Sequence, residues 1–104
     1  MNIYIVTVVQ IGDPIWQWGV LHISCKRTIG WFFTPKDAER AVAKSVRKNI
    51  GGVYYDHCVI EEISHGLYPH TNATQEKWFE WVNGRYLSIN KPVGLEEKTN
   101  FSIG

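Results

Sequence analysis

An apolar strand that runs directly into a capped helix constrains the fold of this chain more than any other segment. Residues 28–33 are rich in β-branched and aromatic side chains, which predicts a strand. Thr34 is a favourable N-cap, Pro35 suits the first helical position, and Asp37 complements the positive end of the helix dipole. The pattern predicts a helix over residues 35–48 that packs on a sheet.

The predicted helix has two contrasting faces. Small apolar or neutral side chains recur at helical spacing on one of them: Ala38, Ala41, Val42, Ser45 and Val46. Because this stripe is narrow and small, we expect the helix to lie close to the sheet. The opposite face carries basic side chains at the same spacing: Lys36, Arg40, Lys44, Arg47 and Lys48.

Other segments supply the rest of the sheet. Residues 3–9 and 53–63 read as strands, residues 15–23 fit either a strand or a long loop, and residues 66–73 predict a loop. Asn83-Gly84 separates two β-rich runs within residues 78–89, which is the signal of a type I′ hairpin. A two-residue turn pairs Trp81 with Tyr86 and leaves apolar side chains on both faces.

These elements predict an α+β fold. We expect an antiparallel or mixed sheet of four to six strands with one helix packed on one face, in the order β(β)βαβββ. The 104 residues make a single domain of ordinary size, 1–104, in which residues 91–104 are a surface-packed tail. Either this tail covers the second face of the hairpin or that face is exposed.

Charge is segregated along the chain. Residues 26–48 hold seven basic and two acidic side chains, a net +5, and the remaining residues hold four basic and eight acidic ones, a net −4. With exposed rings for stacking, such a basic surface is compatible with nucleic acid, but an acidic protein surface would suit it equally well. An exposed polar helix face is also what any helix packed on a sheet presents to water.

Aromatic residues are more abundant than one small core requires. The chain has five Trp, five Tyr and four Phe, which together make 13% of its residues. We expect some of these rings at the surface, where aromatic side chains favour interfaces. The candidates for partner binding are Trp16, Trp18, Phe79, Trp81 and Tyr86. Trp31 and Phe32 alternate along a strand, so one should face the helix and the other should face away.

Residues suited to catalysis or metal binding lack the necessary spacing. The candidate metal ligands are His22, Cys25, His57, Cys58, His65 and His70, without the paired C-x-x-C pattern of a zinc site. Ser64-His65 and Glu61-Glu62 are neighbours in sequence, so their side chains would point to opposite faces of a strand. We therefore expect no metal, no cofactor and no enzymatic activity, unless a deep pocket joins two of His57, Cys58, Glu61, His65 and His70.

Four groups of residues share a pattern with one class of small proteins: residues 28–42, Tyr55–Ile63 with the following Gly66-Leu-Tyr, Glu80–Tyr86 with Lys91-Pro92, and the ending Asn100–Gly104. On these segments the chain resembles small accessory proteins of bacteriophages and prophages. It implies a strand–helix–strand core and a protein that binds and modulates a host component. It implies no catalytic residues.

The expectation for function is a non-enzymatic, phage-encoded binding protein that occludes or sequesters a host protein. The alternative is a nucleic-acid or nucleotide-binding module that uses the basic helix face and exposed aromatic rings, and a homodimer is a further partner to consider. The chain has no run of 18 apolar residues and no signal peptide, which predicts a soluble protein of the host cytoplasm without membrane contact.

Overall fold

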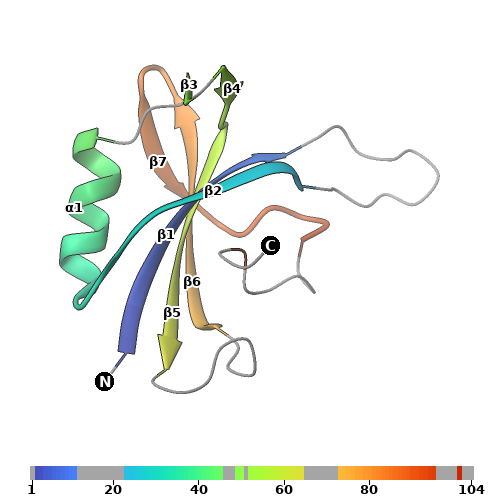
Figure 1. The fold of residues 1–104 in the computed structure, drawn as a ribbon. Coiled ribbons are helices and arrows are strands. Elements are labelled where there is room, and N and C mark those ends of the chain that lie inside the picture. Colours follow the sequence, from blue (N-terminus) through green and yellow to red (C-terminus); the bar gives the residue numbers. More distant parts are fainter. Residues whose placement is uncertain are drawn as a thin grey trace.

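The computed structural model describes residues 2–11, 23–45, 49–50, 52–64, 73–95 and 101. One helix and seven strands lie in these ranges (Figure 1). In chain order they are β1 (Asn2–Ile11), β2 (Ile23–Phe32), α1 (Pro35–Ser45), β3 (Asn49–Ile50), β4 (Val53–Tyr54), β5 (His57–Ser64), β6 (Ala73–Val82) and β7 (Arg85–Ile89). The predicted α+β class, with one helix against one sheet, is confirmed.

Five of the strands form an antiparallel sheet in the order β2-β1-β5-β6-β7. β3 and β4 form a separate two-stranded ribbon after the helix, which the sequence did not indicate. Strand β2 begins at Ile23, earlier than predicted, and β6 already includes Ala73, which we assigned to a loop. Most of the ambiguous segment 15–23 lies outside the described residues.

The predicted strand 53–63 is divided between β4 and β5. Asp56 lies in the interruption, where its carboxylate Oδ1 accepts a hydrogen bond from the Ile11 backbone N–H at 3.1 Å. Its carbonyl accepts another from the Trp81 N–H at 2.9 Å. Asp56 therefore satisfies backbone donors at the ends of two other strands, which requires a bend rather than a continuous strand.

Helix α1 begins as the sequence predicts. Thr34 accepts a hydrogen bond from the Asp37 N–H through its side-chain Oγ1 at 3.2 Å, which is the N-cap interaction. The helix extends to Ser45 within the described residues, and the predicted last turn, 46–48, lies outside them. Ala38 and Val42 from the small-residue stripe are buried.

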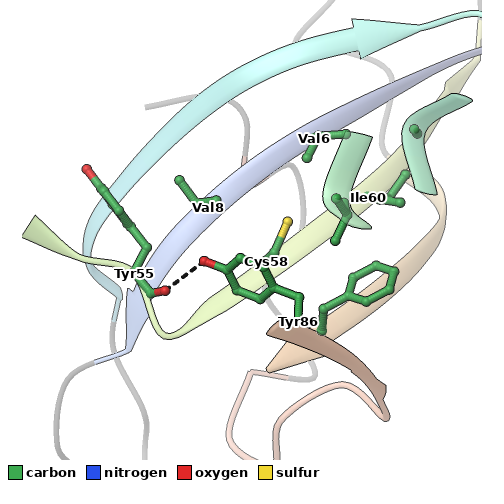
Figure 2. Close-up of a cluster of buried hydrophobic side chains, with 9 residues drawn as sticks. Val6, Val8, Tyr55, Cys58, Ile60 and Tyr86 are labelled. Carbon is green, nitrogen blue, oxygen red and sulfur yellow. Dashed lines mark hydrogen bonds between the residues drawn. The ribbon is translucent and has the colours of Figure 1, made fainter. Parts of the chain in front are cut away.

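Large sheet side chains complement the small helix stripe on the face that carries α1, here called the helix face. The buried cluster on this face draws on β1, α1, β5, β6 and β7 and on the residues before β5 (Figure 2): Val6, Val8, Ala38, Val42, Tyr55, Cys58, Ile60, Phe79 and Tyr86. Tyr86 donates its hydroxyl to the carbonyl of Tyr55 at 2.8 Å. This contact satisfies the one polar group of a buried ring.

A second core lies on the opposite face of the sheet, here called the outer face. It contains Val9, Val59 and Trp78 from the sheet, with Leu95 and Phe101 from the C-terminal tail. The Phe101 and Trp78 rings are 5.0 Å apart in an edge-to-face arrangement. In Figure 1 the tail runs on the opposite side of the sheet from α1. Within the described part of the tail, Leu95 and Phe101 complete this core.

Polar contacts also hold the tail on the outer face. The Lys91 ammonium lies 3.0 Å from a carboxylate oxygen of Glu76, and the Phe101 N–H donates to the Glu61 carboxylate at 2.9 Å. Glu61 is fully buried, so this contact helps to satisfy a carboxylate that has no access to water. The tail therefore covers the part of the hairpin's second face around Trp78, whereas Leu87 on the same face remains 37% exposed.

The hairpin has the predicted turn and register. Asn83 and Gly84 have φ angles of 50° and 88°, as a type I′ turn requires at both central positions. Trp81 lies opposite Tyr86, and Phe79 lies opposite Ser88. This register directs Phe79 and Tyr86 into the helix-face core and Trp78 into the outer-face core.

Candidate functional site

The rings that we expected to contact a partner are mostly not surface groups in the described residues. Phe79 and Tyr86 are only 7% and 9% exposed and belong to the helix-face core. Trp16 and Trp18 lie outside the described residues. Phe79 and Tyr86 are therefore packing residues, a correction to the expected aromatic surface. The physical reason is that the Ala38–Val42 side of α1 is too small to fill the space above the sheet.

Trp81 has an intermediate position. Its ring is half-buried, packs against the helix-face core, and lies 5.0 Å from the ring of Tyr86 at an interplanar angle of 79°. A ring in this position contributes to the hairpin through a cross-strand aromatic pair.

The most exposed large rings of the described residues lie at the end of β2 and just beyond it. Trp31 and Phe33 are 57% and 60% exposed, and their ring centroids are 5.2 Å apart with an interplanar angle of 88°. Ile29, on the same strand, is 37% exposed. The two rings form an apolar patch, here called the β2 patch, at one edge of the sheet, and Ile29 precedes them along the strand.

The alternation of the sequence explains the exposure of Trp31. Phe32 lies opposite Tyr4 and packs against the helix-face core, whereas Trp31 lies opposite Ile5 and belongs to the outer face. The prediction that these neighbouring rings face opposite ways is confirmed. Phe33 was not among the rings predicted to bind a partner, since it follows the last residue of β2 and has no strand partner that fixes its direction.

Basic side chains flank the β2 patch along the chain. Lys26 and Arg27 precede it on β2, and Lys36 follows it in the first turn of α1; all three are exposed. Arg40 and Lys44 are exposed as well, and Arg40 lies 3.6 Å from Asp37. The predicted basic helix face is thus a solvent-facing surface in its described part. Arg47 and Lys48 lie outside the described residues.

A small crevice of about 150 Å³ separates the start of α1 from the sheet. Its walls include Tyr4, Glu39, Ile60, Glu62 and Lys77. Lys77 forms an ion pair with Glu39, and the Asn2 side-chain amide donates to Glu62 at 2.5 Å. The crevice thus places paired charges around an apolar floor, and its described lining supplies no nucleophile with an adjacent base.

The candidate catalytic residues are not brought together in that crevice. His57 lies on the outer face with its Nδ1 2.9 Å from Asp56 Oδ1 and its Nε2 3.6 Å from Glu80 Oε2. Cys58 points to the helix face, as expected for a neighbour on the same strand. His65 and His70, like His22, lie outside the described residues. Among the described residues, no group of three or more His, Cys, Asp or Glu side chains could hold a metal ion.

Cys58 is poorly suited to nucleophilic chemistry. It is fully buried, and desolvation raises the pKa of its thiol to about 12, so the thiol is protonated at neutral pH. Cys25 is partly exposed, and both cysteines are free. The described part of the chain therefore presents an apolar and basic surface along β2 and α1 as its most distinctive functional feature.

Comparison with known proteins identifies no relative of this chain. No protein-family model matches the chain, and neither the curated proteins nor the solved structures contain a match. The helix in the described residues, α1, has eleven residues, and no described helix has the length and apolar character needed to cross a membrane.

Proposed function

We propose that this protein is a non-enzymatic binding protein that acts by occluding a protein partner, and that the β2 patch contacts this partner. The observation that carries the proposal is the exposure of Trp31 and Phe33, each more than half accessible, on a small protein that buries its other described large rings more deeply. Fully burying such a side chain contributes about 1.5–3 kcal/mol, so an interface gains substantially by covering both rings.

The surrounding charge supports a role for this surface in recognition. Arg27 and Lys36 lie on either side of the β2 patch along the chain, where they can attract a partner of opposite charge and restrict its orientation. The resemblance of the sequence to phage accessory proteins supports a bacterial host protein as this partner, encountered in the host cytoplasm.

The second candidate function is nucleic-acid binding, which the combination of exposed rings and cations favours. The arrangement of the rings argues against this function, because Trp31 and Phe33 contact each other edge to face and do not form one flat surface for base stacking. The described basic residues on α1 are also few, namely Lys36, Arg40 and Lys44.

The two functions separate in one capture experiment. The tagged protein is incubated with an extract of its native cells, with and without nuclease, and the retained material is identified at increasing salt. A protein partner remains after nuclease and decreases only moderately with salt, because aromatic burial is insensitive to screening. Nucleic-acid binding predicts that the retained material is lost after nuclease treatment and that affinity falls steeply with salt. Replacing Lys36, Arg40 and Lys44 should then weaken binding further. That result would overturn the proposed function.

A further inference from the structure

The edge of β2 offers a second kind of contact beside its aromatic rings. β2 has ten residues and is the terminal strand of the five-stranded sheet, and no other strand in the described part of the chain pairs with its outer edge. A terminal strand presents backbone N–H and C=O groups on its outer edge, which can accept a further strand.

The side chains of β2 determine which strand would fit there. From the register with β1, Lys26 and Trp31 lie on the outer face, opposite Val9 and Ile5, whereas Arg27 lies on the helix face, opposite Val8. A strand paired with β2 places its side chains next to these groups on the same two faces. Both faces would then carry a cation near the middle of β2, and the outer face would carry the Trp31 ring near its end.

Charge distinguishes between the two simplest occupants of this edge. A second copy of the chain would bring the same net positive charge of the segment 26–45, five basic and two acidic side chains, to the interface. Lys and Arg on an edge strand disfavour that kind of self-pairing. An acidic segment brings the opposite charge and meets no such repulsion.

We propose that an extended, acidic peptide segment of the partner adds to β2 as a further strand of the sheet. This inference rests on the proposed protein-binding function and specifies its recognition mode. The segment carries two neighbouring acidic residues that face Lys26 and Arg27. It also carries an apolar residue that packs on Trp31, about four positions from the acidic residue that faces Lys26. Lys26 and Trp31 share the outer face because the register with β1 shifts between Val6 and Thr7, which places them opposite Val9 and Ile5.

A selection from random peptides of ten residues, the length of β2, tests this inference. The wild-type protein and two charge-reversal variants, Arg27→Glu and Arg85→Glu, serve as baits; Arg85 is an exposed residue at the β6–β7 turn and provides the matched control. We expect wild type and Arg85→Glu to enrich acidic peptides with the spacing given above. Arg27→Glu should bind the enriched peptide about tenfold more weakly, the loss of one close charge pair.

Backbone methylation separates strand addition from simple charge attraction. Two forms of an enriched peptide are prepared, one with N-methyl groups at its odd-numbered residues and one with N-methyl groups at its even-numbered residues. One of the two forms should bind at least about tenfold more weakly, because its methyl groups block the edge that forms hydrogen bonds with β2. Equal binding by both methylated forms overturns strand addition. Enrichment of neutral or basic peptides, or no enrichment, overturns it as well.

The remaining outcomes identify the competing occupants. Sedimentation equilibrium measures whether the free protein dimerises. A dimer that is lost in Trp31→Ala would assign the edge to a second copy of the chain. Displacement of the enriched peptide by a single-stranded thymidine oligonucleotide would assign it to nucleic acid. If native-partner capture depends on Trp31 but the peptide test fails, the proposed function stands and only strand addition is wrong.

Discussion

The buried hydroxyl of Tyr86 shows how an aromatic side chain that reads as a surface group can belong to the core. The ring fills space beneath α1, and the hydroxyl is satisfied by the Tyr55 carbonyl at 2.8 Å. Burial, with smaller contributions from Cys58, Asp56 and Tyr54, raises the pKa of Tyr86 above its ordinary range. A Tyr with a backbone partner is compatible with burial, so residue type alone does not separate core from interface.

Replacing Tyr86 by Phe tests this contact. The variant keeps the ring but leaves the Tyr55 carbonyl without its hydroxyl donor, so the free energy of unfolding should fall by about 1 kcal/mol. Urea denaturation monitored by circular dichroism measures the change. Tyr54→Phe is the control, because Tyr54 is 40% exposed and should lose clearly less. Equal losses in the two variants would contradict the assigned role of Tyr86.

The Cys58 thiol predicts a loss of stability at alkaline pH. Its folded-state pKa is raised from the ordinary 9.0 to about 12, so above pH 9 the unfolded chain releases a proton that the folded chain keeps. Stability should therefore decrease as the pH rises from 9 toward about 12, because the thiol ionises in the unfolded chain but not in the folded one. Urea midpoints across this range should fall less steeply for Cys58→Ala than for wild type or Cys25→Ala. Identical slopes in all three proteins would show that the thiol does not titrate in this way.

At the scale of elements, local signals predicted the parts of the fold that depend on few residues. The Thr34 cap and the Asn83-Gly84 turn each satisfy a local geometric requirement, and both appear as expected. The bend at Asp56 was not predictable, because its hydrogen-bond partners on β1 and β6 are far away in the sequence. Interactions between distant elements override local strand propensity at that point.

Gly84 should be the most sensitive position of the hairpin turn. Its φ of 88° is unfavourable for a residue with a Cβ atom, so Gly84→Ala should lower the free energy of unfolding by about 1 kcal/mol although the added methyl meets no atom within 4 Å. Gly30→Ala is the matched control, since its Cβ would meet Phe32 at an ordinary 3.6 Å. Thermal unfolding of both variants compares them. A larger loss at Gly30 would contradict the backbone explanation.

The C-terminal tail should behave as a structural element of the outer-face core. Phe101 is 4% exposed and packs on Trp78, so Phe101→Ala should cost about 3 kcal/mol and increase cleavage of the tail in limited proteolysis. Val93→Ala, at a site in the same tail that is 83% exposed, should change neither quantity by much. Unchanged stability in Phe101→Ala would mean that the tail is not part of the cooperative core.

Across the whole molecule, covering both faces of one sheet explains most of the aromatic excess. The sequence shows more rings than one helix can cover, and the structure distributes most of the described ones over a helix-face core and an outer-face core completed by Leu95 and Phe101. Sequence patterns could not indicate that the tail covers Trp78 while Trp31 remains exposed. Whether each ring is covered depends on where a segment distant in sequence packs, and the residues next to Trp78 and Trp31 in the sequence do not indicate this.

Contact between the exposed rings at the end of β2 and a partner protein can be measured by quantitative capture with matched variants. Nuclease-treated extract of the native cells is applied to wild type, to Trp31→Ala/Phe33→Ala, and to Leu87→Ala, which removes a 37% exposed side chain from the other edge strand. A protein retained by wild type and by Leu87→Ala should be reduced at least about tenfold on the double variant, while all three proteins stay equally folded. Equal retention on the double variant would contradict this contact.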